Sequence, residues 1–280
     1  MTGDFDPPVS AVVDAVRRAL AEDLGNLGDL TSVAIIPADV DGHGVFVARA
    51  PGVLAGTAAA TEVYDYLDPG VTIDWQAADG DDLSAGQVIA ALNGPFRSLL
   101  TGERSALNFL GHLSGVATLT RAYVTAAGDR TAIRDTRKTT PGLRALEKAA
   151  VRAGGGVNHR GSLSDAVLIK DNHLRWCAIP DAVARARKRW PGVVVEVECD
   201  TLDQVGEAKS AGADLVLLDN MTPAQVAEAV AILGGAAPVE ASGGVTLETV
   251  ADYAAAGADL VSVGALTHSA PVLDIALDLD

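Results

Sequence analysis

The sequence AGADLVLLD at residues 211–219 recurs as AGADLVSVG at residues 256–264, an offset of 45 residues. In each copy a nearly continuous apolar run follows a glycine turn, which is typical of a strand buried on both faces of a parallel sheet. A helical pattern, the short apolar segment PVEAS and a second helical pattern separate the two copies. We therefore expect the copies to form equivalent strands on either side of one β–α unit.

The same alternation of apolar runs and helical patterns extends over most of the chain after Gly128. Six segments are predicted to be strands: TAIRDT, AVLIK, VVVEVE, ADLVLLD, PVEAS and ADLVSVG. Strands that alternate with helices predict a parallel sheet. We favour an α/β barrel over a doubly wound sheet because polar residues follow nearly every strand, at the end where barrel enzymes carry their active sites.

The N-terminal part of the chain has a different pattern. Residues 8–24 show helical spacing of apolar side chains, and residues 40–95 contain short β-type runs separated by turn dipeptides. Residues 101–127 are predicted to form one long helix that links two domains.

The chain is acidic overall but basic in one region. The formal net charge is −16 and the pI is about 4.6, yet nine of the 41 residues from Arg130 to Lys170 are Lys or Arg and three are acidic. A concentrated patch of opposite sign attracts small anionic ligands into a cleft. Nucleic acid is disfavoured as a partner by the low pI and by the scarcity of aromatic residues.

Cysteine content and the termini bear on the compartment. Cys177 and Cys199 have no metal-type spacing, so we interpret them as ordinary thiols in a reducing compartment. The N-terminus has no leader-like pattern, and no segment approaches about 18 uninterrupted apolar residues. We expect a soluble cytoplasmic protein that does not contact membranes.

Polar or glycine residues follow each of the six predicted strands. In chain order these are Asp135, Arg137 and Lys138; Lys170 and Asp171; Glu198; Asp219 and Asn220; Ser242, Gly243 and Gly244; and Gly264. A single strand-end charge is usually only solvated or paired in a salt bridge. Six such positions in succession, at the rim where parallel strands end, indicate an active site.

The basic members of this set suit a substrate with several anionic groups. Arg137 and Arg160 offer planar forks for carboxylate or phosphate, and Lys138 and Lys170 offer point charges. His159 follows three glycines and lies within the basic cluster, which favours contact with a ligand over a purely structural role.

Carboxylates and glycine turns complete the predicted site. Glu198 and Asp219 could bind Mg²⁺ or sugar hydroxyls, but they do not make a closed metal cage, so a metal carried by the substrate fits better. The turns at 242–245 and 263–266 precede helices and can present backbone amides to a phosphate.

With these residues in view, the chain resembles the quinolinate phosphoribosyltransferases, also called carboxylating nicotinate-nucleotide pyrophosphorylases, from about residue 20 to 270. The matching stretches are GERSALNFLGHLSGVAT (102–118), RDTRKTTPGLRALEKAAVRAGGGVNHR (134–160), LSDAVLIKDNH (163–173), VEVE (195–198), LLDNM (217–221), EASGGV (240–245) and SVGALTHS (262–269). The resemblance implies an N-terminal α/β sandwich domain over residues 1–105 and an incomplete α/β barrel over residues 106–280, whose last residues can return to the first domain. It also implies seven barrel strands, one more than the six counted above.

The resemblance further implies the reaction and its participants. Such enzymes transfer phosphoribose from phosphoribosyl pyrophosphate to the ring nitrogen of quinolinate, with release of pyrophosphate and CO2, and they require Mg²⁺. The product, nicotinate mononucleotide, enters NAD synthesis. The family acts as a homodimer with shared active sites, and Arg104 is similar to an arginine that crosses into the neighbouring subunit's site.

Roles for individual residues also come from the resemblance. Arg137, His159 and Arg160 would hold the two ring carboxylates, Lys138 and Lys170 would approach the phosphates and the reacting centre, and Glu198 and Asp219 would face ribose hydroxyls and Mg²⁺. The turns at 242–244 and 262–264 would hold the 5′-phosphate. The full set of expected substrate contacts is Arg104 of the partner subunit, Thr136, Arg137, Lys138, His159, Arg160, Lys170, Glu198, Asp219, Ser242, Gly243, Gly244, Ser262, Val263 and Gly264.

Three other functions remain open at this point. One is a phosphoribosyltransferase that acts on nicotinate or another pyridine without decarboxylation. The second is a Schiff-base aldolase that uses Lys170 at a barrel strand end. The third is a non-catalytic regulator that binds anions, which would leave Glu198 and Asp219 without a reason to face the site.

Overall fold

The computed structural model describes residues 6–280, which form two compact units. The first unit combines the described residues up to Arg121 with Thr139–Gly155 and Leu266–Asp280, and the second combines Ala122–Lys138 with Gly156–Ala265. The first unit therefore draws on both ends of the chain. Residues 1–5, at the start of the predicted N-terminal domain, lie outside the described part.

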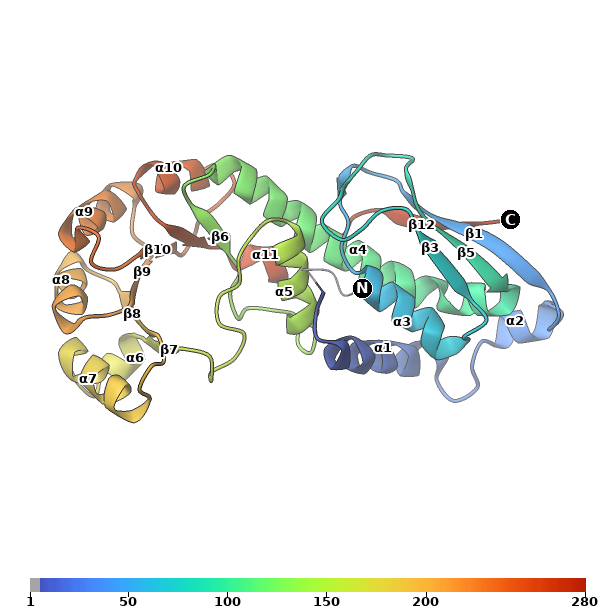
Figure 1. Ribbon diagram of the computed structural model, residues 1–280, viewed down its shortest axis with the longest axis horizontal. Helices are drawn as coiled ribbons and strands as arrows, with labels where there is room; N and C mark the ends of the chain where they lie inside the picture. Colours follow the sequence, from blue (N-terminus) through green and yellow to red (C-terminus); the bar gives the residue numbers. More distant parts are fainter. Residues whose placement is uncertain (1–5) are drawn as a thin grey trace. The chain divides into compact units, whose positions relative to one another are not determined.

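The second unit is built on a parallel sheet with the strand order β6-β11-β10-β9-β8-β7. Figure 1 shows helices α7 to α10 around the outside of these strands. The strands are β6 (Ala132–Arg134), β7 (Val167–Ile169), β8 (Val195–Cys199), β9 (Leu215–Asp219), β10 (Val239–Ser242) and β11 (Leu260–Ser262). The helices are α6 (Asp171–Leu174), α7 (Ile179–Arg189), α8 (Leu202–Ala211), α9 (Pro223–Leu233) and α10 (Val250–Ala255).

All six strands predicted from the sequence are confirmed; five lie within their expected segments, and β8 extends one residue beyond its segment, to Cys199. The recurring segments form β9 and β11, and both pair with β10, which lies between them as expected. A single parallel bridge between Arg134 and Val157 extends the sheet beyond β6, and the amide of Val157 donates to the carbonyl of Ile133 at 2.8 Å. Pairing stays limited to this bridge next to a run of three glycines, a residue type that weakens strands.

The two copies of the repeated sequence make the same local contact. Asp214 begins the run that forms β9, and its carboxylate accepts the amide of Val195 on β8 at 2.8 Å. Asp259 stands at the equivalent place before β11, and its carboxylate accepts the amide of Val239 on β10, also at 2.8 Å. Each aspartate thus holds the first residue of a neighbouring strand. This contact also fixes how far the carboxyl end of that strand extends toward the edge of the sheet where the strands end.

Capping residues place the helices that follow two of the strands. Thr201 caps α8 and Thr222 caps α9, and each forms a capping box with a glutamine three residues later. Two residues separate β8 from α8, and three separate β9 from α9. The short connections keep the ends of β8 and β9 open at the rim.

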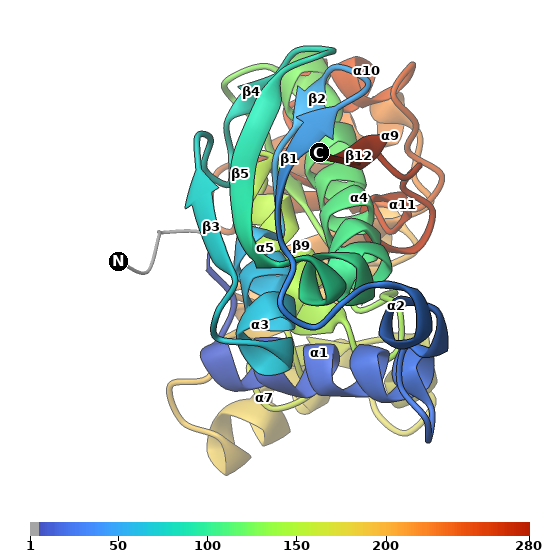
Figure 2. The ribbon, with the colours of Figure 1, turned by 90° about the vertical axis from the view of Figure 1, so that its right-hand side faces the viewer.

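The first unit contains an antiparallel sheet with the strand order β12-β1-β5-β3. The C-terminal strand pairs with β1, where Gly44 lies opposite Leu279, and Figure 2 shows these strands from the side. The strands are β1 (Asp41–Ala48), β2 (Gly52–Val53), β3 (Thr72–Trp75), β4 (Asp82–Leu83), β5 (Val88–Pro95) and β12 (Ile275–Leu279). The helices are α1 (Val9–Leu24), α2 (Leu30–Ile35), α3 (Thr57–Leu67), α4 (Phe96–Ala127), α5 (Arg144–Ala153) and α11 (Ala265–His268). Helix α4 continues past Arg121 into the second unit, and α11 begins one residue before Leu266, where the first unit resumes.

The helices predicted at residues 8–24 and 101–127 are confirmed as α1 and α4, although α4 begins earlier, at Phe96. It runs through residue 105, where the sequence-based domain boundary was placed, and the compact units divide at Arg121. The aromatic core of this unit centres on Phe46, whose ring stacks on Trp75 with centroids 6.1 Å apart.

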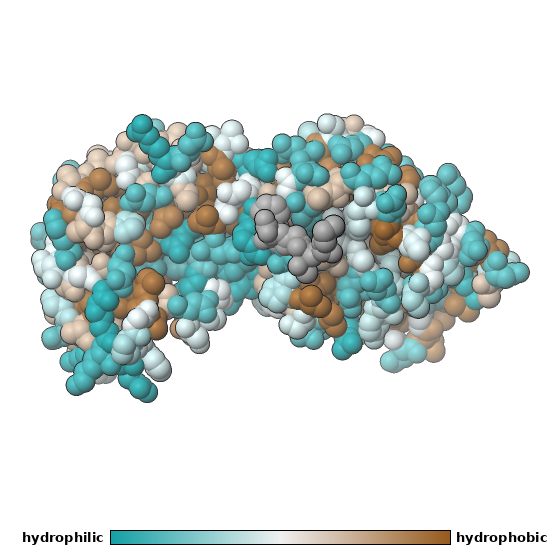
Figure 3. Space-filling model, viewed as in Figure 1, coloured by the Kyte–Doolittle hydropathy of each residue, from teal (hydrophilic) through white to brown (hydrophobic). Residues whose placement is uncertain are grey.

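Surface and thiol properties are consistent with the composition. Among the described residues, none of the helices combines the length and the apolar character that a membrane crossing requires. On the face shown in Figure 3, hydrophilic residues separate smaller hydrophobic groups. Cys177 and Cys199 are free thiols, as expected, and burial raises the pKa of Cys199 to about 12.

Candidate active site

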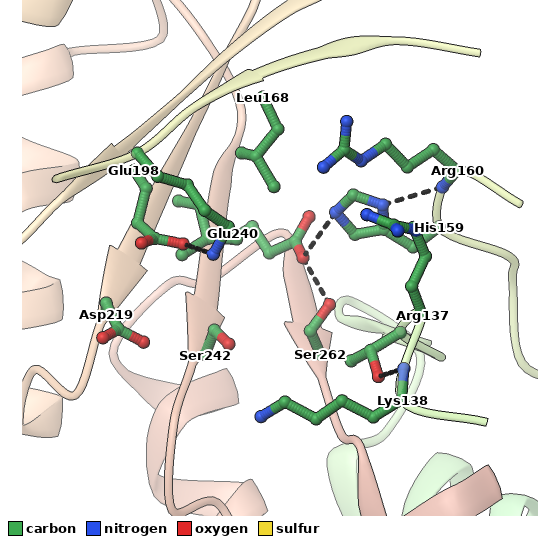
Figure 4. A pocket seen from close by; sticks show the side chains of 13 residues that line it. Arg137, Lys138, His159, Arg160, Leu168, Glu198, Asp219, Glu240, Ser242 and Ser262 are labelled. Atoms are coloured by element: carbon green, nitrogen blue, oxygen red, sulfur yellow. Dashed lines mark hydrogen bonds and ion pairs between the residues drawn. The ribbon is translucent and has the colours of Figure 1, made fainter. Parts of the chain in front are cut away.

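A cavity of about 300 Å³ opens in the second unit where the strands end. This volume lies at the lower end of the range for small-molecule sites. Its lining residues come from the strands of the parallel sheet and from the segments that follow them, and Figure 4 shows their side chains. They are Thr136, Arg137, Lys138, His159, Arg160, Leu168, Lys170, Glu198, Leu217, Asp219, Glu240, Ser242 and Ser262.

Ten of the expected substrate-contacting residues line this one cavity. Gly243, Gly244, Val263 and Gly264 do not line it but directly follow residues that do. Arg104 lies exposed on α4 in the first unit. Ten of the thirteen lining residues were therefore predicted from the sequence, and their individual roles toward the substrates stay predictions.

Three lining residues were missed: Leu168, Leu217 and Glu240. The two leucines are ordinary strand residues and gave no signal. Glu240 did give one, because an acidic residue stands inside the short apolar strand PVEAS, two positions before Ser242. Residues two apart on a strand share a face, so the position of Glu240 relative to Ser242 could have indicated it.

One side of the cavity is strongly cationic. Arg137 and Arg160 lie together there in Figure 4, whereas the side chain of Lys138 extends away from them. Burial lowers the pKa of Arg160, and the charge of Arg137 lowers it further. The guanidinium of Arg160 is oriented by a hydrogen bond from its Nη1 to the carbonyl of Ala166 at 3.1 Å. Two mutually repelling guanidinium groups form a site that a dianion would stabilise.

His159 is held on both sides by the protein. Its backbone amide donates to the buried carboxylate of Asp135 at 2.8 Å, just beyond the end of β6. Its ring Nδ1 accepts the backbone amide of Arg160 at 2.7 Å, which requires the proton of the neutral ring to be on Nε2. That Nε2 lies 3.3 Å from Glu196 and 3.7 Å from Glu240. The expected contact of His159 with a substrate carboxylate stays a prediction.

The opposite side of the cavity carries Glu198 and Asp219 at the ends of neighbouring strands. Lys170 donates a hydrogen bond to Glu198 and forms an ion pair with it. Burial raises the pKa of Glu198, with a further contribution from the charge of Asp219, while Lys170 acts in the opposite direction. Two carboxylates that repel each other, and that offer only oxygen donors, fit a divalent cation such as Mg²⁺.

The turn after β10 has a backbone that only glycine fits. Gly243 has φ +94°, and a Cβ there would lie 2.2 Å from the side-chain oxygen of Asn220. Gly244 has φ +64°, and a Cβ there would meet nothing within 4 Å. The turn is therefore packed against Asn220 at Gly243 and open at Gly244. A phosphate needs such an open stretch to come close to backbone amides.

A buried acidic cluster lies beside the cavity. Within the described residues, His159, Glu196 and Glu240 are grouped closely enough to ligate a metal. However, Arg134 forms an ion pair with Glu240, and the proton on Nε2 of His159 occupies the position that a metal would need. We therefore interpret this cluster as a hydrogen-bonded network rather than a metal centre.

Comparison with known protein families gives matches over nearly the whole chain. The family model described as "Quinolinate phosphoribosyl transferase, N-terminal domain" matches residues 29–114, and the model for the C-terminal domain of the same family matches residues 116–278. Together these matches span both compact units.

Individual relatives are similar at comparable length. The carboxylating nicotinate-nucleotide pyrophosphorylase of Mycobacterium leprae is 45% identical, and the alignment covers 98% of this chain and 99% of that protein. A probable enzyme of the same name from Bacillus subtilis is also 45% identical, covering 92% and 90%. The solved nicotinate-nucleotide pyrophosphorylase from Francisella tularensis matches with a TM-score of 0.94, at 38% identity over 100% of both chains. The expected fold, an α/β barrel with an N-terminal α/β domain, is thereby confirmed.

Proposed function

The chain belongs to the quinolinate phosphoribosyltransferase family, and on that basis we propose that it transfers phosphoribose from phosphoribosyl pyrophosphate to quinolinate, with decarboxylation. The products are nicotinate mononucleotide, pyrophosphate and CO2, in the route to NAD. The observation that carries this proposal is the cavity itself, which sets a paired arginine cluster opposite two carboxylates. The reaction would take place in the cytoplasm, as befits the bacterial relatives, although some plant relatives are named as chloroplastic or mitochondrial.

Arg137 and Arg160 would bind the two carboxylates of quinolinate. Each guanidinium can donate two parallel hydrogen bonds to one carboxylate. Because the charge of Arg137 lowers the pKa of Arg160, a bound dianion would relieve their repulsion. A pyridine with one carboxylate would leave one guanidinium uncompensated, so the paired cluster favours quinolinate over nicotinate.

Glu198 and Asp219 would act at the ribose. When the bond to pyrophosphate breaks, the ribose becomes oxocarbenium-like, and two nearby carboxylates stabilise its positive charge. Mg²⁺, bound through these carboxylates and the pyrophosphate, would supply charge neutralisation for the leaving group. Lys138 would add a second cation on the phosphate side, and Lys170, already ion-paired with Glu198, would lie between ribose and acceptor. The turns at 242–244 and 262–264 would hold the 5′-phosphate.

Decarboxylation then follows from the charge on the ring. The alkylated ring nitrogen is cationic, and its charge stabilises the electron pair left on the neighbouring carbon when the bond to CO2 breaks. That carbon then takes up one proton, so each turnover consumes a proton. Holding the second carboxylate on an arginine during the first step keeps the two steps in one site.

We further propose that Arg104 completes the site from a partner subunit of a homodimer. Arg104 is exposed on α4, so its guanidinium is available to another copy of the chain. The family resemblance implies that this arginine reaches into the neighbouring subunit's active site.

The alternative functions are less well supported. An aldolase would need the Lys170 amine free to attack a carbonyl, but that amine is held in a hydrogen bond and ion pair with Glu198. A regulator without activity does not agree with membership of an enzyme family.

The decisive assay follows the loss of quinolinate absorbance with phosphoribosyl pyrophosphate and Mg²⁺, while CO2 and nicotinate mononucleotide are measured in the same tube. We expect the two products in equal amounts. Turnover of nicotinate but not quinolinate would replace the proposal with a non-decarboxylating activity. Borohydride trapping of a covalent adduct on Lys170 would support the aldolase instead.

A further inference from the structure

Glu240 is a buried carboxylate whose partners come from three other segments of the second unit. Its side chain is 0% exposed. One oxygen accepts a hydrogen bond from Arg134 on β6, and the other accepts one from the hydroxyl of Ser262 on β11. The second oxygen also lies 3.7 Å from Nε2 of His159. A single carboxylate on β10 therefore contacts two other strands and the segment that carries His159.

These partners belong to different sides of the cavity. Figure 4 shows Glu240 between His159 and Ser262, with dashed lines to both. His159 is followed directly by Arg160, on the side proposed to bind the dicarboxylate. Ser262 begins the turn at 262–264 that is proposed to hold the 5′-phosphate.

The contact with His159 extends to Arg160. Nδ1 of His159 accepts a hydrogen bond from the backbone amide of Arg160, so the orientation of the ring fixes the position of the Arg160 backbone nitrogen. The ring orientation is in turn set by Nε2, which faces Glu196 and Glu240. A shift of the Glu240 carboxylate would therefore move an anchor of Arg160 as well as the hydroxyl of Ser262.

Stability alone does not explain this arrangement well. Burial raises the pKa of Glu240, so the protein bears a cost for keeping a carboxylate there. Buried ion pairs such as Glu240 with Arg134 contribute little or no net stability compared with apolar residues of the same size. The charge is accounted for if Glu240 holds β6, β11 and the segment with His159 in fixed positions relative to one another.

We infer that Glu240 is a positioning residue that couples the dicarboxylate side of the cavity to the phosphate side. The inference rests on the proposed function. It predicts that one substitution at Glu240 weakens the binding of both substrates, although the side chain is buried beneath the groups proposed to contact them.

The first test is E240Q, which keeps the size of the side chain and removes its charge. Calorimetric titration with quinolinate alone, and separately with phosphoribosyl pyrophosphate and Mg²⁺, should show both dissociation constants raised about 10- to 100-fold. D214N is a control, because Asp214 pairs with an arginine as Glu240 does, but it is exposed and binds the amide of Val195 at the opposite, amino-terminal end of the strands. We expect D214N to lower the melting temperature without changing either affinity.

The second test examines the coupling without altering Glu240. S262A removes a donor to Glu240 on the phosphate side, and a coupled network predicts that it weakens quinolinate binding by about threefold or more, in line with the loss of one hydrogen bond. S242A is its control, because Ser242 lines the same cavity but is not among the partners of Glu240 in the described chain. It should change only the affinity for phosphoribosyl pyrophosphate.

The outcomes separate the inference from the proposed function. If the unaltered protein does not turn over quinolinate, the proposed function is wrong. If it does, and E240Q changes neither affinity or only one, the coupling role is wrong, whatever happens to the melting temperature. Should E240Q fail to fold, an S262A protein with normal quinolinate affinity would overturn the inference by itself.

Discussion

Lys170 and Glu198 form an ion pair across the carboxyl ends of the neighbouring strands β7 and β8. The pair brings together a cation and a carboxylate that both line the cavity. Glu198 is also subject to the charge of Asp219 on the next strand, which contributes to its raised pKa. The local arrangement of charge is therefore negative on β8 and β9, where a positive ribose would develop.

This arrangement predicts that E198Q and D219N lower the turnover number far more than they weaken quinolinate binding. Each substitution removes a charge that acts in the transition state, and we expect a loss of about 100-fold or more in kcat. Steady-state kinetics with quinolinate titrated at saturating phosphoribosyl pyrophosphate measures the effect. E207Q, on the exposed face of α8, is the control and should behave as the unaltered enzyme. Unchanged kcat in both cavity variants would contradict the role of the carboxylates.

A second prediction concerns Arg160. R160K keeps the positive charge but loses the planar fork, so the dissociation constant of quinolinate should rise about 10- to 100-fold. Binding of phosphoribosyl pyrophosphate should change much less. R187K is the control, since Arg187 pairs with Asp214 at the opposite end of the strands. Equal quinolinate affinity for R160K and the unaltered protein would show that a point charge is sufficient at this position.

The sequence predicted the second unit better than the first because its signals there are local. Each strand is a short apolar run with a polar residue at its end, and the repeated Asp214 and Asp259 mark where two of the strands begin. The pairing of β1 with the C-terminal strand β12 involves residues 227 to 235 positions apart in the chain, and no local pattern encodes such a contact. Register between distant strands is decided by packing rather than by propensity.

Within the site, the sequence predicted which residues gather but not how they are held. Strand ends that follow one another in a parallel sheet meet at one rim, so the positions of Lys170, Glu198 and Asp219 followed from topology. The contact of Glu240 with Arg134, Ser262 and His159 depends on side chains from three strands and from the segment that carries His159. Such contacts appear only once the strand order and register are known.

A third prediction concerns the pH dependence of stability. Burial raises the pKa of Glu240, with Glu196 adding to the effect and Arg134 opposing it, so the folded chain keeps a proton on this group to a higher pH than the unfolded chain does. The stabilisation from that proton is complete below the unfolded pKa, about 4.3, and is lost as pH rises through the folded pKa. The excess stability of the unaltered protein over E240Q should therefore increase as pH falls from 7 toward about 4.3.

Urea unfolding of both proteins at several pH values measures this difference. D214N gives a control of opposite sign. Burial raises the pKa of Asp214, but the hydrogen bond from the amide of Val195 and the guanidinium of Arg187 outweigh this effect, so the pKa is lowered. Its stabilisation is present above the unfolded pKa and lost as pH falls through the folded pKa, so the excess over D214N should decrease on acidification. A pH-independent difference for E240Q would contradict the buried-charge assignment.

The fourth prediction tests the proposed sharing of active sites between subunits. If Arg104 acts in the partner's cavity while Lys170 acts in its own, R104A and K170A should each be nearly inactive. A heterodimer of the two variants would place both defects in one cavity and leave the other intact. An equal mixture, after exchange of subunits, should therefore recover about a quarter of normal activity.

Mixing R104A with R104A labelled by a different tag controls for exchange itself and should recover none. Failure to recover activity from R104A and K170A, once the tags show that heterodimers have formed, would place Arg104 in the cavity of its own subunit or outside the site altogether.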